Sequence, residues 1–518
     1  MSQSGKADSR SCVVAATPQA AQAGAAMLHA GGNAIDAACA AAWALGVCEP
    51  AESGLGGQTT MLVRKADGTC VVVDGHSRAP ALLQRKRVGR RAQKRGMKSV
   101  SVPSTAATLD YVQKKYGKLK LADVIGPAIV LAHEGYAISK LQRRLLKWTV
   151  PFFQDGSIEA NLFLKDGAAY ERGGLFRQPV LGKTLERLAA QGVEDFYQGK
   201  IASEIARDMK DRGGLITAKD LAELNLPVER EPLRMMYRGF EVLSLPPPGG
   251  GVQLLLALQI LQKLWRPTDS LKDWRGAMVQ ATLSAFRERE RWPDHPADMT
   301  PSIARWMASP ERAEAVVEAL RDGRNQAPVS DSLGGEDGNT THLCAIDREG
   351  NVVSLTQSIQ SVFGAKVAHP TLGFVYNNYL STCPREPHPY QLRGGGIPQS
   401  NAAPTIVLSD GEPLIALGSA GSRRIVSSLV QVLSAMIDHK MAVADALKLP
   451  RVHPLVGGGI WAEKAVGETA LVDLEQKFGK VRRFGSLNYK FGAVQALTKY
   501  ENTVVGAGDP RRDGSMAV

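Results

Sequence analysis

The sequence lacks several features that assign a protein to a class at once. It has no run of about eighteen apolar residues, so we expect no membrane span. Residues 1–10 (MSQSGKADSR) lack the apolar core of a signal peptide, which favours a cytoplasmic location. No internal repeat is evident, which argues against a solenoid or a propeller.

Metal and cofactor motifs are also missing. The chain has no CxxC pair, so neither a zinc site nor a redox motif is indicated, and its cysteines are expected to be small buried hydrophobes. Residues 49–58 (EPAESGLGGQ) are rich in glycine but match neither a Walker loop nor a dinucleotide fingerprint. We therefore expect no metal and no cofactor.

The charge is unevenly distributed. The formal net charge is +12, and residues 84–98 alone carry eight basic and no acidic side chains. This segment has no aromatic residue for stacking on bases, and no nucleic-acid-binding motif accompanies it. We expect a solvated loop near the rim of a site, able to attract acidic substrates, rather than a nucleic-acid partner.

At 518 residues the chain is long enough for several domains or for one large α/β unit. Hydrophobic spacing, alanine-rich runs and terminal glycines predict helices over residues 19–30, 34–47, 121–135, 201–212 and 252–264. Short apolar runs predict strands over residues 12–16, 60–63, 70–74 and 237–242.

Residues 338–347 (GNTTHLCAID) contain a threonine, Thr340, that becomes an N-terminus if the chain is cut before it. The following residues predict a hairpin with strands at 343–346 and 352–357, which holds this threonine at its edge. A threonine with a free α-amine carries its own general base. An ordinary strand is the alternative, since threonine is β-branched and suits strands.

A series of motifs makes the catalytic interpretation the better one. Residues 31–38 (GGNAIDAA), the pair Glu49-Pro50 and residues 53–57 (SGLGG) resemble, in this order, the start of the γ-glutamyltransferase family. Later segments are similar to landmarks of the same family, among them 195–199 (DFYQG), 246–251 (PPPGGG) and 508–514 (GDPRRDG). The resemblance covers roughly residues 12 to 516.

The resemblance implies an α/β (α+β) protein with the four-layer αββα sandwich of the N-terminal nucleophile hydrolases. It implies a precursor that cuts itself between Asn339 and Thr340, just after the loose segment 322–338, where a cut is tolerated. The products are a helix-rich large segment, 1–339, and a small catalytic segment, 340–518, intertwined in one unit. Each is then the other's partner, and a homo-oligomer is left open.

The resemblance also implies the chemistry. Thr340 attacks an amide carbonyl, and water or an amine then takes the acyl group from the acyl-enzyme. Ser358 matches a threonine that hydrogen-bonds the nucleophile. Gly421 and Ser422 match the family's Gly-Gly oxyanion loop, and serine keeps the backbone N–H but has less φ/ψ freedom. His342 is expected to be structural, because the α-amine supplies the base.

The residues for the substrate's far end depart from the family pattern. Gln360 matches an asparagine that contacts the α-carboxylate end of the substrate. His76 occupies the position of a carboxylate-binding arginine, and histidine is not equivalent to arginine for bidentate binding of a carboxylate. Arg78, two residues on and on the same strand face, is the candidate substitute. Ser400 keeps one of two family serines, and Asn401 replaces the other.

Tyr379 and Thr382 stand where the family has a glutamine and an aspartate that hold the α-amine. An ammonium without an acid partner is costly to bury, so we expect a small amide whose acyl group carries a carboxylate but no free α-amine. Glutaryl-type and oxamate-type amides, used by acylase branches of the family, fit this description. A true γ-glutamyl transferase or glutathione hydrolase, and a non-cleaving binding protein of the same fold, remain alternatives.

Overall fold

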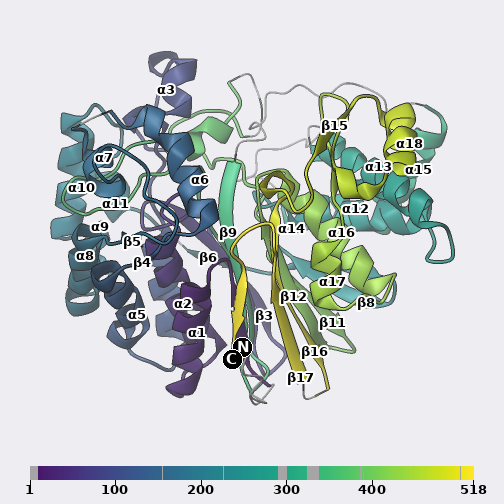
Figure 1. The fold of residues 1–518 in the computed structure, drawn as a ribbon, viewed down its shortest axis with the longest axis horizontal. Helices are drawn as coiled ribbons and strands as arrows, with labels where there is room; N and C mark the ends of the chain where they lie inside the picture. The colour runs from purple at the N-terminus through teal and green to yellow at the C-terminus, as the bar shows by residue number, and fades with distance from the viewer. Residues whose placement is uncertain are drawn as a thin grey trace.

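Two β-sheets face each other at the centre of the molecule, and helices cover the outer face of each (Figure 1). The computed structural model describes residues 10–154, 156–225, 227–289, 300–323, 338–385, 388, 390–501 and 503–518. Most of the segment 322–338, predicted to be a loose linker, lies outside these ranges.

The larger sheet is antiparallel in every described pair. In spatial order its strands are β18 (Ser515–Ala517), β1 (Cys12–Ala15), β9 (Gly338–Ile346), β10 (Val352–Ser361), β2 (Gln58–Arg64), β3 (Cys70–Gly75) and β6 (Val228–Arg230). The predicted hairpin around Thr340 is confirmed as β9 and β10, and the strands predicted near residues 12, 60 and 70 are β1, β2 and β3.

The smaller sheet has the order β17 (Thr503–Gly508), β16 (Ala493–Tyr500), β12 (Glu412–Ala420), β11 (Thr405–Ser409), β8 (Phe240–Ser244) and β7 (Leu233–Tyr237). The single strand predicted over 237–242 is wrong, because the chain reverses there into β7 and β8. Arg238 has φ 51° and Gly239 has φ 89°, the two positive values that a tight hairpin turn needs.

One helical layer packs on the larger sheet. It contains α1 (Pro18–His29), α2 (Ala34–Cys48), α4 (Thr105–Tyr116), α5 (Leu121–Glu134), α6 (Lys140–Thr149), α7 (Ile158–Phe163), α8 (Pro179–Gln191), α9 (Glu194–Tyr197), α10 (Lys200–Asp211) and α11 (Ala218–Ala222), with α3 (Arg90–Lys94) at one end (Figure 1). The helices predicted over 19–30, 34–47, 121–135 and 201–212 are confirmed as α1, α2, α5 and α10, within two residues at each end.

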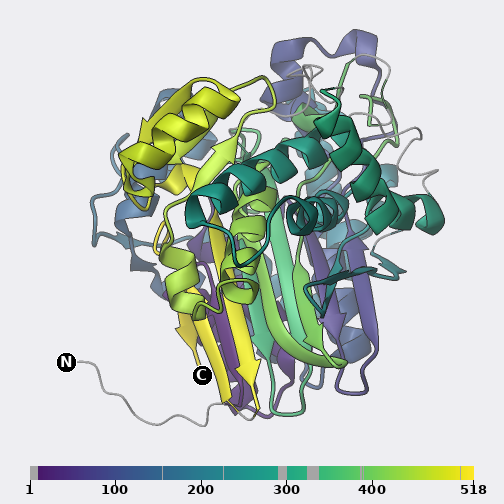
Figure 2. The ribbon, with the colours of Figure 1, turned by 90° about the vertical axis from the view of Figure 1, so that its right-hand side faces the viewer.

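The other helical layer packs on the smaller sheet. It contains α12 (Gly251–Leu264), α13 (Leu271–Arg289), α14 (Pro301–Met307), α15 (Pro310–Arg321), α16 (Arg424–Ile437), α17 (Val443–Lys448) and α18 (Glu468–Phe478), and Figure 2 shows these helices in front of the strands. The predicted helix over 252–264 is α12. No helix among the described residues has the length and apolar character needed to cross a bilayer.

Short elements complete the chain. They are β4 (Tyr136–Ala137), β5 (Leu175–Phe176), β13 (Val452–Pro454), β14 (Ile460–Glu463), β15 (Val481–Phe484), and the 3₁₀ turns η1 (Arg85–Arg87), η2 (Met97–Ser99), η3 (Val150–Phe152), η4 (Tyr379–Thr382), η5 (Lys464–Val466) and η6 (Tyr489–Phe491).

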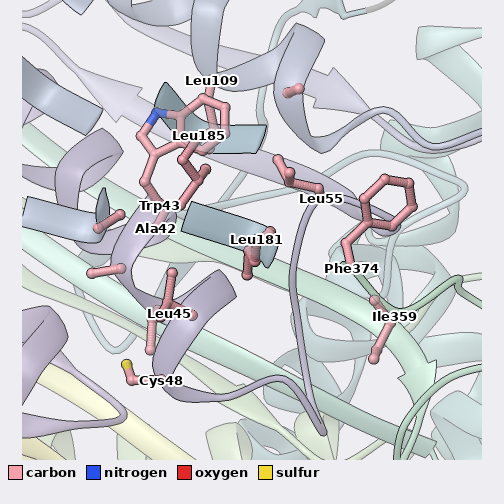
Figure 3. Close-up of a cluster of buried hydrophobic side chains, with 14 of the residues drawn as sticks. Ala42, Trp43, Leu45, Cys48, Leu55, Leu109, Leu181, Leu185, Ile359 and Phe374 are labelled. Carbon is pink, nitrogen blue, oxygen red and sulfur yellow. The ribbon is translucent and has the colours of Figure 1, made fainter. Parts of the chain in front are cut away.

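Helix α2 shows why the larger sheet sits so close to its helical layer. Asn33 caps it and forms a capping box with Asp36, and its alanines allow the backbone to approach β9 and β10. Figure 3 shows Trp43 and Leu45 of this helix in the same apolar cluster as Ile359 of β10. The strand that carries Ser358 is therefore fixed from behind.

Apolar side chains also fill the space between the sheets. This layer includes Val14 of β1, Leu62 of β2, Cys344 of β9 and Ile406 of β11, all fully buried. Strands β9 and β10 pack against β12 of the opposite sheet. The predicted four-layer αββα sandwich is thus present, and the start of β9 lies within it.

Candidate active site

Thr340 is the third residue of β9 and is only 6% exposed. The strand runs without a break through the bond between Asn339 and Thr340 and is held between β1 and β10. Gln360 and Ser361 of β10 pair with Asn339 and Gly338, so both sides of this bond are anchored in the sheet. The threonine hydroxyl therefore starts from a fixed position.

A bulge in β10 brings Ser358 to Thr340. The register shifts between Gln357 and Gln360, and Gln360 takes a positive φ of 79°. Thr340 Oγ1 donates to Ser358 Oγ (3.1 Å), and Ser358 Oγ donates to the carbonyl oxygen of Asn339 (2.7 Å). One serine hydroxyl therefore accepts from the Thr340 hydroxyl and polarises the carbonyl of the adjoining peptide bond.

A buried arginine clamps the same peptide. Arg512 Nη1 donates to Glu52 Oε2 (2.6 Å) and to the Thr340 carbonyl (2.9 Å), and its Nη2 donates to Asn339 Oδ1 (2.8 Å). Asn339 Nδ2 donates to Glu52 Oε1 (2.6 Å), which closes a ring of hydrogen bonds around the Asn339 side chain. Although burial lowers it, Glu52 raises the pKa of Arg512 above its ordinary value, so the clamp stays charged.

A second carboxyl lies beside this clamp. Thr341 Oγ1 donates to Glu49 Oε2 at 2.6 Å. Burial, and then the neighbouring Glu52, raise the pKa of Glu49 well above its ordinary value of 4.5. One positive charge on Arg512 thus serves two carboxyls, and a proton on Glu49 relieves the excess negative charge.

This proton makes stability depend on pH. Unfolded Glu49 releases this proton near pH 4.5, whereas folded Glu49 keeps it to a higher pH. The stabilisation of the folded state by this proton is therefore fully present below pH 4.5 and is lost as the pH rises towards the raised pKa. The free energy of unfolding falls by up to about 1.4 kcal/mol per pH unit in that window. Glu49→Gln, which keeps an oxygen for Thr341, is expected to flatten this part of the pH profile of the melting temperature.

The measurement is made in a Thr340→Ala background, so that chain cleavage does not contribute. An unchanged profile after Glu49→Gln contradicts the assignment of the proton to Glu49.

The loop predicted as an oxyanion hole joins β12 to α16. Gly421 has φ 118° and Ser422 has φ 58°, so both lie in the left-handed region, and the serine is strained there in a way that glycine is not. A Cβ placed on Gly338 would lie 2.7 Å from the Cβ of Ser422. Arg424 Nη2 donates to the Gly338 carbonyl (3.2 Å), so this loop lies against the chain just before Thr340.

His76 and Arg78 follow the end of β3, two strands from β10. Ser358 pairs with Gln58 of β2, and Thr59 pairs with Gly75, so His76 lies in line with Ser358 at about 10 Å, two strand spacings. His76 Nδ1 is 2.6 Å from Asp74 Oδ1, and its buried Nε2 has no hydrogen-bond partner among the residues that the structure describes.

Asp74 links this corner to a second arginine. Arg230 Nη1 donates to Asp74 Oδ2 (2.9 Å). Burial raises the pKa of Asp74, but His76 and Arg230 outweigh it and hold this pKa below its ordinary value. Burial lowers the pKa of the nearby Arg78. The corner therefore gathers several basic groups around one carboxylate.

Tyr379 and Thr382 both lie in η4 and are buried. Burial raises the pKa of Tyr379, and the side chains of Ser358 and Gln58 lie near its hydroxyl. Thr382 Oγ1 donates to the Tyr379 carbonyl (2.9 Å). The tyrosine therefore lies close to Ser358.

Ser400 and Asn401 are held by Arg289. Arg289 Nη1 donates to Asn401 Oδ1 (2.5 Å) and Nη2 to the Ser400 carbonyl (2.6 Å), while Ser400 Oγ accepts from the Ala402 N–H (3.2 Å). These contacts occupy the Asn401 oxygen and the Ser400 backbone. The structure thus brings Thr340, Ser358 and Gln360 together. The groups around His76 and around Ser400 and Asn401 meet at Pro247 and Pro248, whose carbonyls accept from Arg230 and Arg289.

His342 has the character of a structural residue. It is fully buried, its Nδ1 is 2.9 Å from Thr356 Oγ1, and burial lowers its pKa to about 3. It lies against Gly418, where an added Cβ would come within 2.1 Å of its ring. A neutral ring packed in this way fixes β9 and β10 against β12.

Glu49, Glu52 and Arg512 are the important residues that sequence reasoning did not single out. They stand in motifs that were noted only as family landmarks, residues 49–58 and 508–514. The signal in the sequence was two acidic residues three positions apart and two adjacent arginines near the chain end, of which Glu52 and Arg512 form a buried ion pair in the structure. Among the described residues, no group of three His, Cys, Asp or Glu side chains is arranged to hold a metal ion.

Comparison with known proteins agrees with this geometry. The model of the gamma-glutamyltranspeptidase family matches residues 20–518. The chain is 32% identical to a glutathione hydrolase proenzyme of Escherichia coli (95% of this chain, 89% of the relative) and 33% identical to an acylase ACY 1 proenzyme of Pseudomonas sp. strain SE83 (98% and 93%). A cephalosporin acylase from Bacillus halodurans superposes with a TM-score of 0.88 at 28% identity, over 100% of this chain and 98% of the other.

The sandwich and these structural neighbours define the class, an enzyme of the N-terminal nucleophile hydrolase type. Within that class, the chain belongs to the gamma-glutamyltranspeptidase family.

Proposed function

We propose that this protein is an amidohydrolase or acyltransferase that cuts its own chain before Thr340 and then uses Thr340 as its nucleophile. The observation that carries the proposal is the hydrogen-bond chain from Thr340 Oγ1 through Ser358 Oγ to the Asn339 carbonyl. It holds the hydroxyl beside the carbonyl that it attacks and polarises that carbonyl.

The processing step follows from these contacts. Thr340 Oγ attacks the Asn339 carbonyl carbon, the peptide nitrogen of Thr340 leaves as the amine, and an ester joins Asn339 to the Thr340 oxygen. Water then hydrolyses the ester and frees both the hydroxyl and the α-amine. The Arg512 clamp keeps the Asn339 side chain away from the reacting atoms throughout.

The two products, 1–339 and 340–518, are expected to stay together. Strand β1 of the large segment pairs with β18 and β9 of the small one, β2 pairs with β10, and β8 pairs with β11 across the same division. Separation of the fragments would break both sheets.

In the processed enzyme, Thr340 attacks a substrate amide with its own α-amine as the base, and water or an amine resolves the acyl-enzyme. We propose a small acyl group that bears a carboxylate. The basic corner of His76, Arg78 and Arg230 supports this, as does the absence of an acid at Tyr379 and Thr382. Relatives named acylase and relatives named glutathione hydrolase are similarly distant.

The test is a panel of glutaryl, oxamyl and γ-glutamyl amides, run on protein whose intact mass has been measured. We expect two fragments and faster turnover of the glutaryl or oxamyl amides. Preference for the γ-glutamyl amide would favour a glutathione hydrolase instead. A single mass after long incubation would favour a non-cleaving binding protein.

A further inference from the structure

The Asn339 side chain occupies a site built from two buried charged groups. Asn339 Nδ2 donates to Glu52 Oε1 (2.6 Å), and Arg512 Nη2 donates to Asn339 Oδ1 (2.8 Å). Glu52 and Arg512 are both buried and pair with each other at 2.6 Å. One acceptor and one donor, each fixed by this ion pair, therefore face the two ends of a primary amide.

The charge of this site suits a neutral group. The carboxylate of Glu52 and the guanidinium of Arg512 cancel each other, and the Tyr489 hydroxyl also donates to Glu52 Oε1 (3.2 Å). A carboxylate in place of the amide would turn an oxygen rather than an N–H group toward Glu52, which is unfavourable. A primary carboxamide offers an N–H to the acid and an oxygen to the arginine at once.

This site lies on the opposite face of β9 from the Thr340 hydroxyl. Side chains alternate along a strand, so Asn339 shares a face with Leu343, which packs toward the helices, and Thr340 shares a face with Cys344, which lies between the sheets. Paired residues share a face, and the register from β9 through β10 and β2 to β3 puts Asp74 on the Thr340 face. The basic corner around Asp74 is therefore a different site.

Turnover by the proposed mechanism requires Asn339 to withdraw. In the uncut chain, Ser358 Oγ donates to the Asn339 carbonyl, the group that Thr340 attacks in the proposed processing step. A substrate attacked by the same hydroxyl must put its own acyl carbonyl at this position. Because only two carbons join the Asn339 carboxamide to that carbonyl, the two leave together, and Glu52 and Arg512 lose their amide.

The emptied site favours a replacement amide. Withdrawal of Asn339 removes a partner from Glu52 Oε1 and from Arg512 Nη2, and buried polar groups without partners are costly. A cavity of about 470 Å³ is lined by Gly338, which precedes Asn339, and by Tyr489, which donates to Glu52. A ligand that enters this cavity therefore lies next to both groups.

Resting on the proposed function, we propose that Glu52 and Arg512 form a subsite for a neutral primary carboxamide on the acyl half of the substrate, separated from the acyl carbonyl by two carbons. The acyl group then repeats the geometry of Asn339 itself, and the 3-carbamoylpropanoyl group is the simplest one that does so. This subsite adds a second determinant of the acyl half to the basic corner around His76.

The first test uses two 4-nitroanilides that differ only at the proposed subsite. The 3-carbamoylpropanoyl anilide carries the amide. The 4-oxopentanoyl anilide has a methyl ketone of the same shape, which keeps the oxygen for Arg512 but has no N–H for Glu52. On the processed enzyme, kcat/KM is expected to be at least about tenfold higher for the carbamoyl compound. Equal values would overturn the subsite.

Chemical rescue tests the subsite without turnover. Thr340→Ala is expected to keep the chain uncut, and Asn339→Gly in this background removes the carboxamide from the site. Acetamide, which has the atoms of the lost side chain, is expected to raise the melting temperature of the double variant by at least about 1 °C, whereas acetone is not. The Thr340→Ala parent, in which Asn339 fills the site, should respond to neither.

The two tests separate this inference from the proposed function. If acetamide rescues the double variant but the unaltered protein turns over no amide, the proposed function fails and the carboxamide site stands. An acetamide effect that acetone or the parent reproduces overturns the site whatever the turnover. If the double variant does not fold, the anilide comparison decides.

Matched variants locate the effect. Glu52→Gln weakens the acceptor by removing its charge and is expected to reduce the carbamoyl preference about fivefold. Glu463→Gln is the control, because Glu463 is equally buried and pairs with Arg511 at 2.6 Å, as Glu52 pairs with Arg512. This variant is expected to keep the preference. An equal loss in both variants would mean general loosening of the fold and would overturn the subsite.

Discussion

Replacing Thr340 by alanine is expected to leave the protein as one chain of 518 residues and 55.5 kDa, with no activity on any amide of the panel. Alanine removes the only atom of this residue that can attack the Asn339 carbonyl or form an acyl-enzyme. We expect a loss of about a thousandfold or more in kcat/KM, as for other nucleophile deletions. Thr340→Ser keeps a hydroxyl and should retain part of both reactions.

The neighbouring threonine supplies the control. Thr340 and Thr341 are both buried, but Thr340 donates to Ser358 and Thr341 donates to Glu49. Thr341→Ser keeps its hydrogen bond and is expected to cut at the same bond as the unaltered chain. Intact-mass measurement shows whether each variant is cut, and N-terminal sequencing of the small fragment shows at which bond. A Thr340→Ala protein that still cuts or still turns over an amide would refute the mechanism.

The helices and strands could be predicted because their signals are local, whereas the four-layer sandwich followed from the resemblance of ordered motifs to the γ-glutamyltransferase family. Glycines after α1, the alanine run of α2 and the alternating residues of the Thr340 hairpin each report on a short segment. The reversal at Arg238 was missed because a positive φ at a non-glycine residue leaves only a weak mark in the sequence.

Contacts of the site that lie within one hairpin could be predicted from the sequence, and contacts between residues far apart in the chain could not. Thr340 and Ser358 lie on adjoining strands of a hairpin, so the contact that the family resemblance implied joins residues close in the sequence. Arg512 meets Glu52 across 460 positions, and no pattern in either neighbourhood specifies that contact. Tyr379, matched to the substrate's far end, lies close to Ser358, and its role at the substrate stays a prediction.

The second large effect is expected at Arg512. Arg512→Lys keeps the charge but cannot reach Glu52, the Asn339 side chain and the Thr340 carbonyl at once, because it lacks the planar fork of donors. We expect the free energy of unfolding to fall by about 3 kcal/mol, since a buried ion pair is left poorly matched. We also expect self-cleavage to slow about a hundredfold, because the reacting peptide is no longer held in line with the Thr340 hydroxyl.

Arg511 is the matched control, because it is as deeply buried and as fully paired but lies away from the reacting bond. Its partners include Glu463 at 2.6 Å and Asp509 at 3.3 Å, and none of its side-chain hydrogen bonds among the described residues goes to Asn339 or Thr340. Arg511→Lys should therefore lower the melting temperature by a similar amount while the cleavage rate, followed by the appearance of the small fragment, changes little. If both variants slow cleavage equally, the slowing reflects general loosening of the fold, and Arg512 has no positioning role at the bond.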